Sequence, residues 1–409
     1  MKSKKHKRPA KKESRIPVIR SPRIRAGLTR IKVVGVGGGG GNAVSRMMEG
    51  DRMKGVEFIA VNTDAQDLDH TVAHRKIYIG KALTRGLGAG MNPDIGKQAA
   101  EENRSEVGEA IDGSDVVFIT AGMGGGTGTG ASPIIAEVSR EKGILTVGIV
   151  TKPFLFEGAQ RSTIAQDGLA RLKEKVDALV VIPNDRIFGL IDKDTPMYRA
   201  FAFIDDVLKN SVKAIAELMN IPGLINIDFA DIKTILKDAG PTMIGIGVAS
   251  GAERSMKAVQ GAVNSPLLEI SIDGAKGVLF SVAGGKDLKM SEVNDIAKAV
   301  SANLDSNARV IFGAYHDKWL KDKAVKVTVI ATGFNGIFNG ARLGAPSLFV
   351  PDVATAKKDI FADITGKNGE KVSVSKGEEA HVRLVSVREP EAPDNDFWAK
   401  PAFLRKKKR

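Results

Sequence analysis

The sequence predicts an α/β protein with a parallel sheet in its first half and a smaller α/β unit in its second half. Between residues 31 and 182, six short apolar runs rich in β-branched residues alternate with helical stretches. That alternation is typical of a parallel sheet covered by helices on both faces. Three of the runs are followed by glycine-rich segments. Because ligands bind at the carboxyl ends of parallel strands, these segments are the first candidates for a binding site.

The elements of the first half can be placed in order. Asp205–Met219 predicts one helix with apolar residues on more than one side, so we expect it to lie between two layers. Pro222 and Gly223 end that helix, and a further helix is predicted within 226–239. The six strand runs are IKVVGV at 31–36, VEFIAV at 56–61, KIYI at 76–79, DVVFIT at 115–120, ILTVGIV at 144–150 and DALVVI at 177–182.

A second series of elements follows Gly240 and Pro241. Helices are predicted near 252–263 and 291–304. Three of the four strands come late and close together, so we expect a mixed sheet. The strand runs are TMIGIGVA at 242–249, GVLFSVAG at 277–284, RVIFGAY at 309–315 and AVKVTVIATG at 324–333.

The formal charge of +13 is concentrated at the two ends of the chain. Residues 1–30 carry a net +11 and residues 400–409 a net +6, which leaves the body between them at −4. A body without a basic stripe does not track a phosphate backbone, so we expect no specific nucleic-acid partner. The absence of cysteine excludes disulfides, thiolate metal sites and a cysteine nucleophile. Without a run of about twenty apolar residues or an apolar signal segment, the sequence predicts a cytoplasmic protein.

Both ends of the chain lack the periodicity of folded elements. Residues 1–29 are rich in Lys, Arg, Pro and Ser and are expected to be disordered. Residues 339–394 predict a linker, in which KVSVS and HVRLVSV are candidates for a local hairpin. The run FWAKPAFL at 397–404 places aromatic residues in a polar tail, which is typical of a docking peptide that orders on binding.

The predicted site is organised around ITAGMGGGTGTGASP, from Ile119 to Pro133. An apolar strand ends there in a loop with almost no side chains and then enters a helix. Glycine permits positive φ and close backbone approach, so consecutive N–H groups can converge on an anion. Thr127 and Thr129 add hydroxyl donors, while Ser132 and Pro133 predict the N-cap and first turn of the helix. A plain turn is the alternative, but it needs fewer glycines than Gly124, Gly125, Gly126, Gly128 and Gly130.

Two further glycine-rich segments follow strands of the same sheet. Gly35, Gly37 and Gly40 satisfy G-x-G-x-x-G directly after a strand, a dinucleotide fingerprint that poly-glycine also matches by chance. Asp64 has two interpretations, an acidic residue for a ribose or a strand-end turn. The third segment is GLGAGMNPDIG at 86–96. Three such segments suit a nucleoside triphosphate, and without G-x-x-x-x-G-K-[ST] the phosphates would be bound mainly by backbone and metal.

Side chains for the sugar and the base come from later segments. Glu157 and Arg161 lie four residues apart, the spacing of one helix face, and form either an ordinary ion pair or part of the site. An Asn or Asp facing the N1, N2 and O6 edge would distinguish guanine from adenine, and a nearby Phe would stack on the ring. The candidates are Asn184, Phe201, Asp205 and Asp206.

The last cluster is NIDFADI, which contains Asn226, Asp228 and Asp231. One interpretation is helix capping by Asp228 with an acidic first turn. The other is that the two carboxylates and the amide polarise a water for attack on a γ-phosphate and help to hold a metal. The preceding helix spans roughly 20 Å at 1.5 Å per residue, which carries the cluster away from the glycine segments of its own chain.

Together these motifs resemble those of FtsZ, the bacterial tubulin-like cell-division GTPases. The similarity runs from about Ile31 to Phe338 and returns at the extreme C-terminus. GGGTGTG is the phosphate loop shared with tubulin. The matching motifs are GVGGGGGNAV, NTDAQ, GAGMNPDIG, AGMGGGTGTGASP, TKPFLFEGAQR, IPND, DDVL, NIDFADI and GPTMIGIG.

The resemblance implies a tubulin/FtsZ-like fold. A Rossmann-like GTPase domain would be joined by a central helix to a smaller α/β domain with a mixed sheet, plus disordered tails. The implied divisions are a basic arm (1–29), a GTP-binding domain (30–204), the central helix (205–222), a C-terminal activation domain (223–338), a linker (339–394) and a partner-binding peptide (395–409).

The resemblance also assigns roles to residues. Asn226, Asp228 and Asp231 match the family's synergy loop, which reaches the GTP of the next subunit and completes the active site between protomers. Head-to-tail contacts of this kind do not close and form filaments. Mg²⁺ is the expected metal, with no protein ligand assigned. The residues implied to bind GTP or GDP are Gly38, Gly39, Gly40, Gly41, Asn42, Ala89, Gly90, Asn92, Gly124, Gly125, Gly126, Thr127, Gly128, Glu157, Arg161, Asn184, Phe201, Asp205 and Asp206.

The implied function is a GTPase activated by self-assembly that forms the cytokinetic ring at the mid-cell division site. A C-terminal peptide is similar to the family's binding site for membrane-tethering and regulatory division proteins; its residues are Pro401, Ala402, Phe403, Leu404 and Arg405. The chain departs from the family pattern at Ala399 and Lys400, and 406–409 is more basic than usual. That basic end predicts weak attraction to anionic lipid, at about 1 kcal/mol per basic residue near a membrane.

Two alternatives from other classes remain at this point. A nicotinamide-dependent oxidoreductase would use Gly35, Gly37, Gly40 and Asp64, but the second unit shows no evident catalytic His or Tyr and two glycine segments would be idle. A nucleotide-binding scaffold that polymerises without hydrolysis is the other, and the intact NIDFADI argues against it.

Overall fold

The computed structural model describes residues 29–49, 53, 55–221, 223–265, 271–302, 304–317, 320 and 323–334. All of them belong to one compact unit of the chain. Residues 1–28 of the predicted arm lie outside these residues, as do the linker, the hairpin, the C-terminal peptide and Pro222. No helix within the described ranges is long and apolar enough to cross a membrane.

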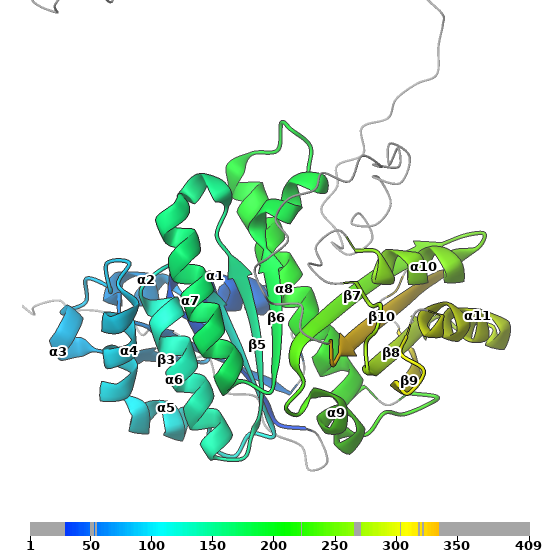
Figure 1. Cartoon of the computed structure of the whole chain (residues 1–409), viewed down its shortest axis with the longest axis horizontal. Coiled ribbons are helices and arrows are strands. Elements are labelled where there is room, and N and C mark those ends of the chain that lie inside the picture. Colours follow the sequence, from blue (N-terminus) through cyan, green and yellow to red (C-terminus); the bar gives the residue numbers. More distant parts are fainter. Residues whose placement is uncertain are drawn as a thin grey trace, which may run out of the picture. The chain divides into compact units, whose positions relative to one another are not determined.

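The first half forms a six-stranded parallel sheet, as the alternating apolar runs predict (Figure 1). Every neighbouring pair within it is parallel, in the order β3-β2-β1-β4-β5-β6. Its strands are near-continuous apolar runs because helices bury both faces. The strands are β1 (Ile31–Val36), β2 (Val56–Asn62), β3 (Arg75–Tyr78), β4 (Val116–Gly122), β5 (Leu145–Lys152) and β6 (Ala178–Pro183).

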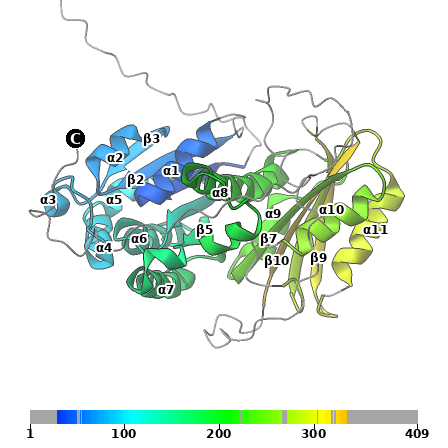
Figure 2. The same cartoon turned by 90° about the horizontal axis from the view of Figure 1, so that it is seen from above.

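Helices cover the two faces of this sheet in separate groups (Figure 2). One apolar core contains side chains from α4 (Pro93–Glu102), α5 (Arg104–Ile111), α6 (Thr127–Glu141) and α7 (Ala159–Lys175). The opposite core contains α1 (Gly37–Met48), α2 (Ala65–His70), α8 (Met197–Asn220) and α9 (Phe229–Leu236). Short connecting turns are α3 (Lys81–Thr84), η1 (Leu155–Glu157) and η2 (Asn184–Gly189).

The central helix α8 lies between two layers, as its apolar pattern predicts. Val212 and Ile215 belong to the core that also contains Leu279 and Ile330 of the second half. The predicted start at Asp205 is wrong, since α8 begins at Met197. The two consecutive aspartates resemble an acidic first turn, but Pro196 occupies the N-cap position and the helix has already begun before them.

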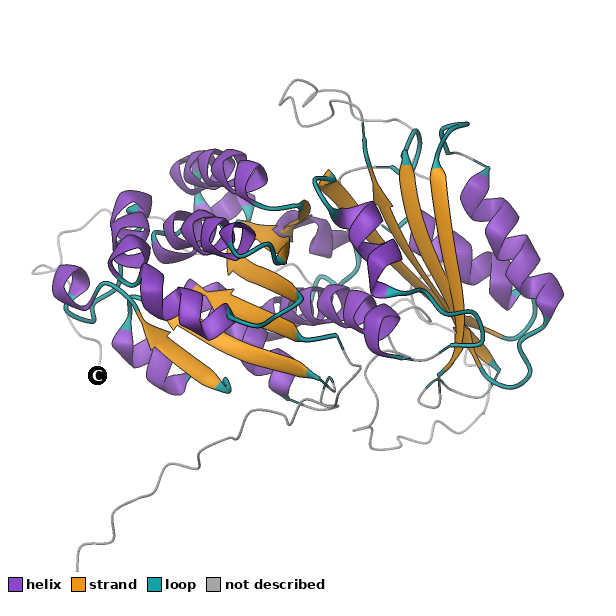
Figure 3. Cartoon of the chain, turned by 90° about the horizontal axis from the view of Figure 1, so that it is seen from below, coloured by secondary structure: helices purple, strands orange, loops and turns teal. Residues whose placement is uncertain are grey.

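The second half forms a mixed sheet, as predicted (Figure 3). Its strands are β7 (Gly240–Ser250), β8 (Gly277–Gly284), β9 (Arg309–His316) and β10 (Ala324–Thr332). The order is β7-β10-β8-β9, with two antiparallel pairs followed by one parallel pair. Helices α10 (Arg254–Val263) and α11 (Met290–Ser301) pack on one face.

The two sheets are joined at a narrow seam between β6 and β7. Only Ala178 with Gly240 and Leu179 with Pro241 pair there, in parallel. The second sheet is predicted as a separate unit, whereas these two pairs make one ten-stranded sheet.

Candidate active site

The carboxyl ends of β1 and β4 are paired side by side, at the point where the strand order reverses. Val36 lies opposite Ala121, and α1 and α6 start from this edge. A reversal of strand order opens a crevice at the carboxyl ends, and two helix N-termini add free N–H groups to it. Gly37–Gly41 form the first turns of α1 rather than a loop in front of it.

The second glycine stretch also enters its helix earlier than predicted. Gly126 is the N-cap of α6, and Ser132 and Pro133 lie inside the helix. The prediction that they start the helix is therefore wrong. Gly124 adopts φ 99°, and its N–H donates to Thr129 Oγ1 at 2.9 Å. This hydrogen bond holds the turn between β4 and α6, so α6 starts close to the end of β4.

The three glycine segments pack against one another so closely that side chains would not fit. A Cβ on Gly37 would lie 2.9 Å from the Gly128 nitrogen. A Cβ on Gly126 would lie 2.7 Å from Ala89 Cβ and 2.9 Å from the Asn92 carbonyl oxygen. We call Gly35–Gly41, Ala89–Asn92 and Gly124–Gly128 together the glycine cradle. The predicted convergence of three segments is confirmed by these contacts.

Part of the glycine cradle borders open space. A Cβ on Gly125 or on Gly90 would meet no heavy atom within 4 Å. The packing constraint that explains Gly126 therefore does not explain Gly125. A backbone without side chains beside open space suits a ligand that needs close approach to N–H groups.

The segments that flank the cradle are fixed by caps and hydroxyl contacts. Asn92 caps α4 by accepting the N–H of Asp94 at 2.9 Å. Asp64 caps α2 by accepting the N–H of Asp67 at 3.0 Å, which supports its turn interpretation over a ribose contact. Thr63 is not among the predicted site residues, yet its Oγ1 lies 2.6 Å from Thr127 Oγ1. Its place at the end of β2, on the same sheet edge, was the available signal.

Glu157 and Arg161 form an ion pair, with Glu157 Oε2 2.5 Å from Arg161 Nη1. The predicted shared helix is wrong, because Glu157 ends η1 and Gly158 at φ 101° separates it from α7. Buried polar atoms nearby lack hydrogen-bond partners among the described residues, namely Arg161 Nε and Asn184 Oδ1. A buried polar atom without a partner is costly, so each marks a place where a ligand group would be stabilised.

Three further candidates lie on α8. Phe201 is 40% exposed and packs edge-on against Phe154, with 5.6 Å between the ring centroids. Asp206 Oδ1 accepts from Arg46 Nε of α1 at 3.3 Å. Burial above all, opposed by the charge of Arg46 and aided by the charges of Asp206 and Glu49, raises the pKa of Asp205 to about 7. Asp205 is thus a carboxyl group poised to titrate near neutral pH.

Comparison with known proteins decides the family. Residues 30–192 match the GTPase domain of the Tubulin/FtsZ family, and residues 240–335 match the C-terminal domain of the FtsZ family. An empty FtsZ dimer from M. jannaschii is 48% identical, with a TM-score of 0.69; the match covers 75% of this chain and 88% of that chain. The chain belongs to the FtsZ family.

This FtsZ-family chain has the tubulin/FtsZ fold and is a GTPase that binds GTP and GDP, as the resemblance implies. The oxidoreductase and non-hydrolysing alternatives are therefore wrong. A mutant form of the M. jannaschii FtsZ matches at 48% identity and a TM-score of 0.70, covering 75% of this chain and 91% of that chain. CetZ2 from Haloferax volcanii, a GTPγS-bound protofilament, shares the fold at 22% identity and a TM-score of 0.64, covering 75% and 94%.

In this FtsZ-family chain, NIDFADI lies beyond the C-terminal end of α8. Asp228 caps α9 by accepting the N–H of Asp231 at 2.8 Å, so the capping interpretation is confirmed. Asn226 Oδ1 accepts from the Gly223 N–H at 2.5 Å. The loop is attached to β9, where Ile225 and Ala314 exchange two backbone hydrogen bonds of 3.1 Å.

The cradle and NIDFADI belong to opposite ends of α8. The helix has 24 residues, roughly 36 Å at 1.5 Å per residue. α8 follows β6 through η2 and so starts from the carboxyl edge of the sheet, where the cradle lies, whereas its last turn contacts β9, where Glu217 Oε2 accepts from the Tyr315 hydroxyl at 3.2 Å. Within the described part of the chain, no group of three or more His, Asp or Glu side chains is arranged to hold a metal ion.

Proposed function

We propose that this GTPase assembles head to tail into filaments and that each GTP is hydrolysed at the interface between two subunits. The observation that supports this most strongly is the placement of the cradle and NIDFADI at opposite ends of α8. The two groups of residues would meet when the end of one subunit that carries NIDFADI contacts the end of the next subunit that carries the cradle. The 48% identical FtsZ that forms a dimer supports self-association of this chain.

We propose that the cradle binds the phosphates through its backbone. The open space beside Gly125 and Gly90 supports this assignment. Two buried atoms without hydrogen-bond partners among the described residues, Arg161 Nε and Asn184 Oδ1, support further nucleotide contacts. Arg161 would lie on the ribose and phosphate side, and Asn184 on the guanine. Phe201 would stack on the ring and Asp205 would accept from the guanine N–H groups. The full proposed set is the nineteen residues from Gly38 to Asp206 named from the sequence.

The proposed hydrolytic residues would have different roles. The Asp228 carboxylate is engaged as the helix cap, and it fixes the first turn of α9. Asp231 in that turn would orient the attacking water, with Asn226 beside it. Bound together with GTP, Mg²⁺ would neutralise phosphate charge. The protein's own contribution would be the positioning of phosphates by one subunit and of water by the other.

The cellular role is proposed from family membership. We propose a cytoplasmic protein that forms the cytokinetic ring at the mid-cell division site, with residues 401–405 binding membrane tethers and regulators and the basic ends adding weak lipid contact. The domain divisions stay as proposed from the sequence, except that the central helix begins at Met197. The boundary between the GTP-binding domain and the central helix therefore moves from 204/205 to 196/197.

The specific GTPase rate should depend on protein concentration. If the site is shared, dilution below the assembly threshold should bring turnover per subunit close to zero, because each bound GTP then lacks a neighbouring α9. Phosphate release across a dilution series measures this, and electron microscopy with GTP and with GDP should show filaments only where turnover is high. A specific rate that is constant down to high dilution would contradict the shared site.

GTP affinity should fall as the pH drops below 7. Asp205 must be ionised to accept guanine N–H groups, and its pKa of about 7 in the free protein means that binding releases a proton below that pH. Affinity should therefore be constant above the pKa and weaken by about tenfold between pH 8 and pH 6. Titration with a labelled GTP measures it.

Asp205→Asn is the matched control for this pH profile. It removes the titrating group while keeping the size of the side chain, and titration of the nucleotide itself is common to both proteins. The variant should bind more weakly at pH 8 and lose the extra decline below pH 7. Identical profiles for the two proteins would remove Asp205 from guanine binding.

A further inference from the structure

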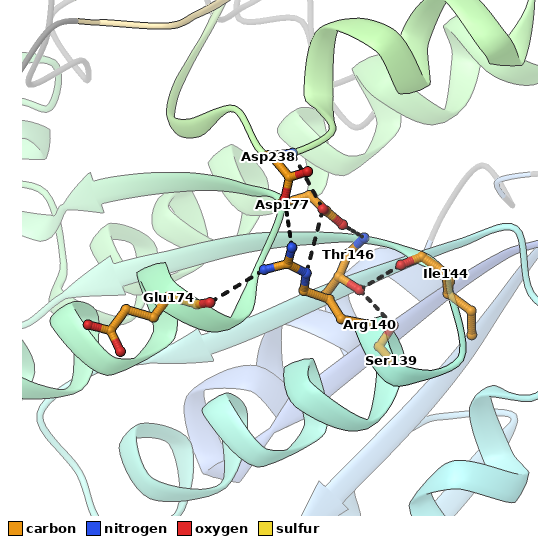
Figure 4. Close-up of polar contacts among 7 residues, drawn as sticks. All are labelled: Ser139, Arg140, Ile144, Thr146, Glu174, Asp177 and Asp238. Carbon is orange, nitrogen blue, oxygen red and sulfur yellow. Dashed lines mark hydrogen bonds and ion pairs between the residues drawn. The ribbon is translucent and has the colours of Figure 1, made fainter.

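Residues of α6, β5 and the turn between α9 and β7 meet at Asp177, at the amino end of β6 (Figure 4). The glycine cradle lies at the carboxyl ends of β1 and β4, the other edge of the same sheet. Asp177 directly precedes β6, and its side chain is 6% exposed. The carboxylate accepts the N–H of Thr146 in β5 at 2.8 Å and that of Asp238 at 3.4 Å. The Asp177 backbone carbonyl accepts the N–H of Gly240, where β7 begins, at 2.8 Å.

Arg140 joins this cluster from the last turn of α6. Its Nη2 lies 2.6 Å from Asp238 Oδ1, and its Nε lies 3.7 Å from Asp177 Oδ1. Its Nη1 donates to the carbonyl of Glu174 near the end of α7 at 3.4 Å. Figure 4 shows the guanidinium between these three groups. One side chain therefore connects α6 and α7 to the segment that leaves α9.

Asp238 occupies the turn between α9 and β7. It adopts φ 52°, in the left-handed region that a residue other than glycine rarely enters. Arg140 donates to the side chain of Asp238, and the Asp177 carboxylate accepts the N–H of Asp238. The direction in which the chain leaves α9 is thus fixed from the GTPase half of the molecule.

The opposite end of α9 carries the proposed hydrolytic residues. The helix has eight residues, roughly 12 Å, so a change in direction at its C-terminal end displaces its first turn. We propose that Arg140 is a positioning residue for hydrolysis. Together with Asp177, it holds the exit of α9 so that the first turn presents Asp231 to the GTP of the neighbouring subunit. This inference rests on the proposed shared site.

The same arrangement connects the two half-sites of one subunit. α6 (Thr127–Glu141) directly follows Gly126 of the cradle, and its fifteen residues end in the turn that carries Arg140. Ser139, beside Arg140, accepts from the Thr146 hydroxyl at 2.8 Å, which anchors this end of α6 on β5. One helix therefore borders the subunit's own phosphates and holds the helix offered to the next subunit.

The test uses Arg140→Gln and Asp238→Asn in the full chain. Asn tolerates the left-handed backbone, so Asp238→Asn removes the charge without forcing a new turn. GTP affinity should stay within about twofold, while turnover at saturating protein should fall by about tenfold, because small displacements of reacting groups are costly. Arg140→Lys should recover part of the rate, and the double variant should be no slower than the slower single variant.

Lys142→Gln is the matched control. Lys142 also lies at the end of α6 and pairs with Asp112 at 2.9 Å, with exposure close to that of the Arg140–Asp238 pair. Within the described part of the chain its ion pair is with Asp112 and not with the α9 exit, so its loss should leave turnover unchanged. Melting temperature, measured for all variants, separates positioning from stability. Asp238→Asn removes only an exposed ion pair, which contributes little to folding, whereas Arg140→Gln also removes a contact with the buried Asp177.

The outcomes separate this inference from the function on which it rests. Wild-type turnover in both Arg140→Gln and Asp238→Asn, with Asp231→Ala impaired, would overturn the role of Arg140 alone. A loss of turnover that only matches lost GTP affinity or lost folded protein would overturn it equally. Wild-type turnover in Asp231→Ala would remove the shared site and this inference together.

Discussion

Replacing Asp231 with alanine should leave GTP binding intact and lower turnover by about a hundredfold or more, the usual effect of removing a group that positions a reacting water. Binding should survive because Asp231 lies in the first turn of α9, beyond the end of α8, whereas the cradle lies at the start of α1 and α6. Affinity for a labelled GTP and phosphate release at saturating protein are the two measurements.

Asp228→Ser provides the control for helix capping. Serine keeps an oxygen that accepts the N–H of Asp231 but removes the charge, so α9 should stay folded. Asp228→Ala removes both the accepting oxygen and the charge and should also destabilise α9, at a cost of about 1 kcal/mol.

If Asp231→Ala hydrolyses GTP at the wild-type rate while forming filaments, Asp231 has no part in the chemistry.

Two neighbouring glycines should respond to alanine in different ways. Gly125 and Gly126 both avoid positive φ, so alanine fits either backbone. The Cβ of Gly125→Ala enters open space, so the melting temperature without nucleotide should not fall. If that space receives a phosphate, GTP affinity should nonetheless drop by at least about tenfold, because the backbone can no longer approach the anion.

Gly126→Ala is the packing counterpart. Its Cβ would clash with Ala89 and with the backbone of Asn92, and overpacking of this kind costs about 1–3 kcal/mol. The melting temperature should therefore fall even without nucleotide. Thermal scans and GTP titrations on both variants separate the two effects. Wild-type GTP affinity in Gly125→Ala would show that no phosphate lies beside Gly125.

The strands could be predicted from sequence because their signal is local. IKVVGV at 31–36 becomes β1 with the same limits, and the other five runs of the first half each become one strand. Buried parallel strands are nearly continuous apolar runs, and a short run flanked by glycine or charge has few alternatives. The mixed second sheet also followed from strand spacing, but its two-pair seam with β6 depends on contacts that no local pattern records.

Helix starts were predicted less well, for a reason that lies in packing. Gly37–Gly41 and Thr127–Gly130 have low helix propensity, yet both stretches are helical. Close approach to neighbouring backbone requires glycine there and overrides propensity. The helix start at Ser132 and Pro133 was predicted from local capping rules, which cannot register a contact such as Gly126 with Ala89.

Some features of the candidate site could be predicted from the sequence, and others could not. The number of glycines indicated an anion site, but close contacts or a positive φ account for four of the five, so that argument is only partly right. Gly125 alone among them is not required by packing. The sequence could not separate capping from chemistry at Asp228, and the structure shows the cap. Thr63 escaped notice because a threonine at a strand end is common, and its partner Thr127 is distant in sequence.

A phosphate site made of main chain restricts how such a protein can be altered. Side chains can be exchanged to tune charge or size, but a glycine beside another backbone offers no smaller replacement, and any larger one intrudes. Attempts to retarget the nucleotide would therefore have to change the base end, at Asn184, Phe201 and Asp205, where there are side chains to exchange. In directed evolution of this chain, new base preferences should arise there, while the cradle stays invariant.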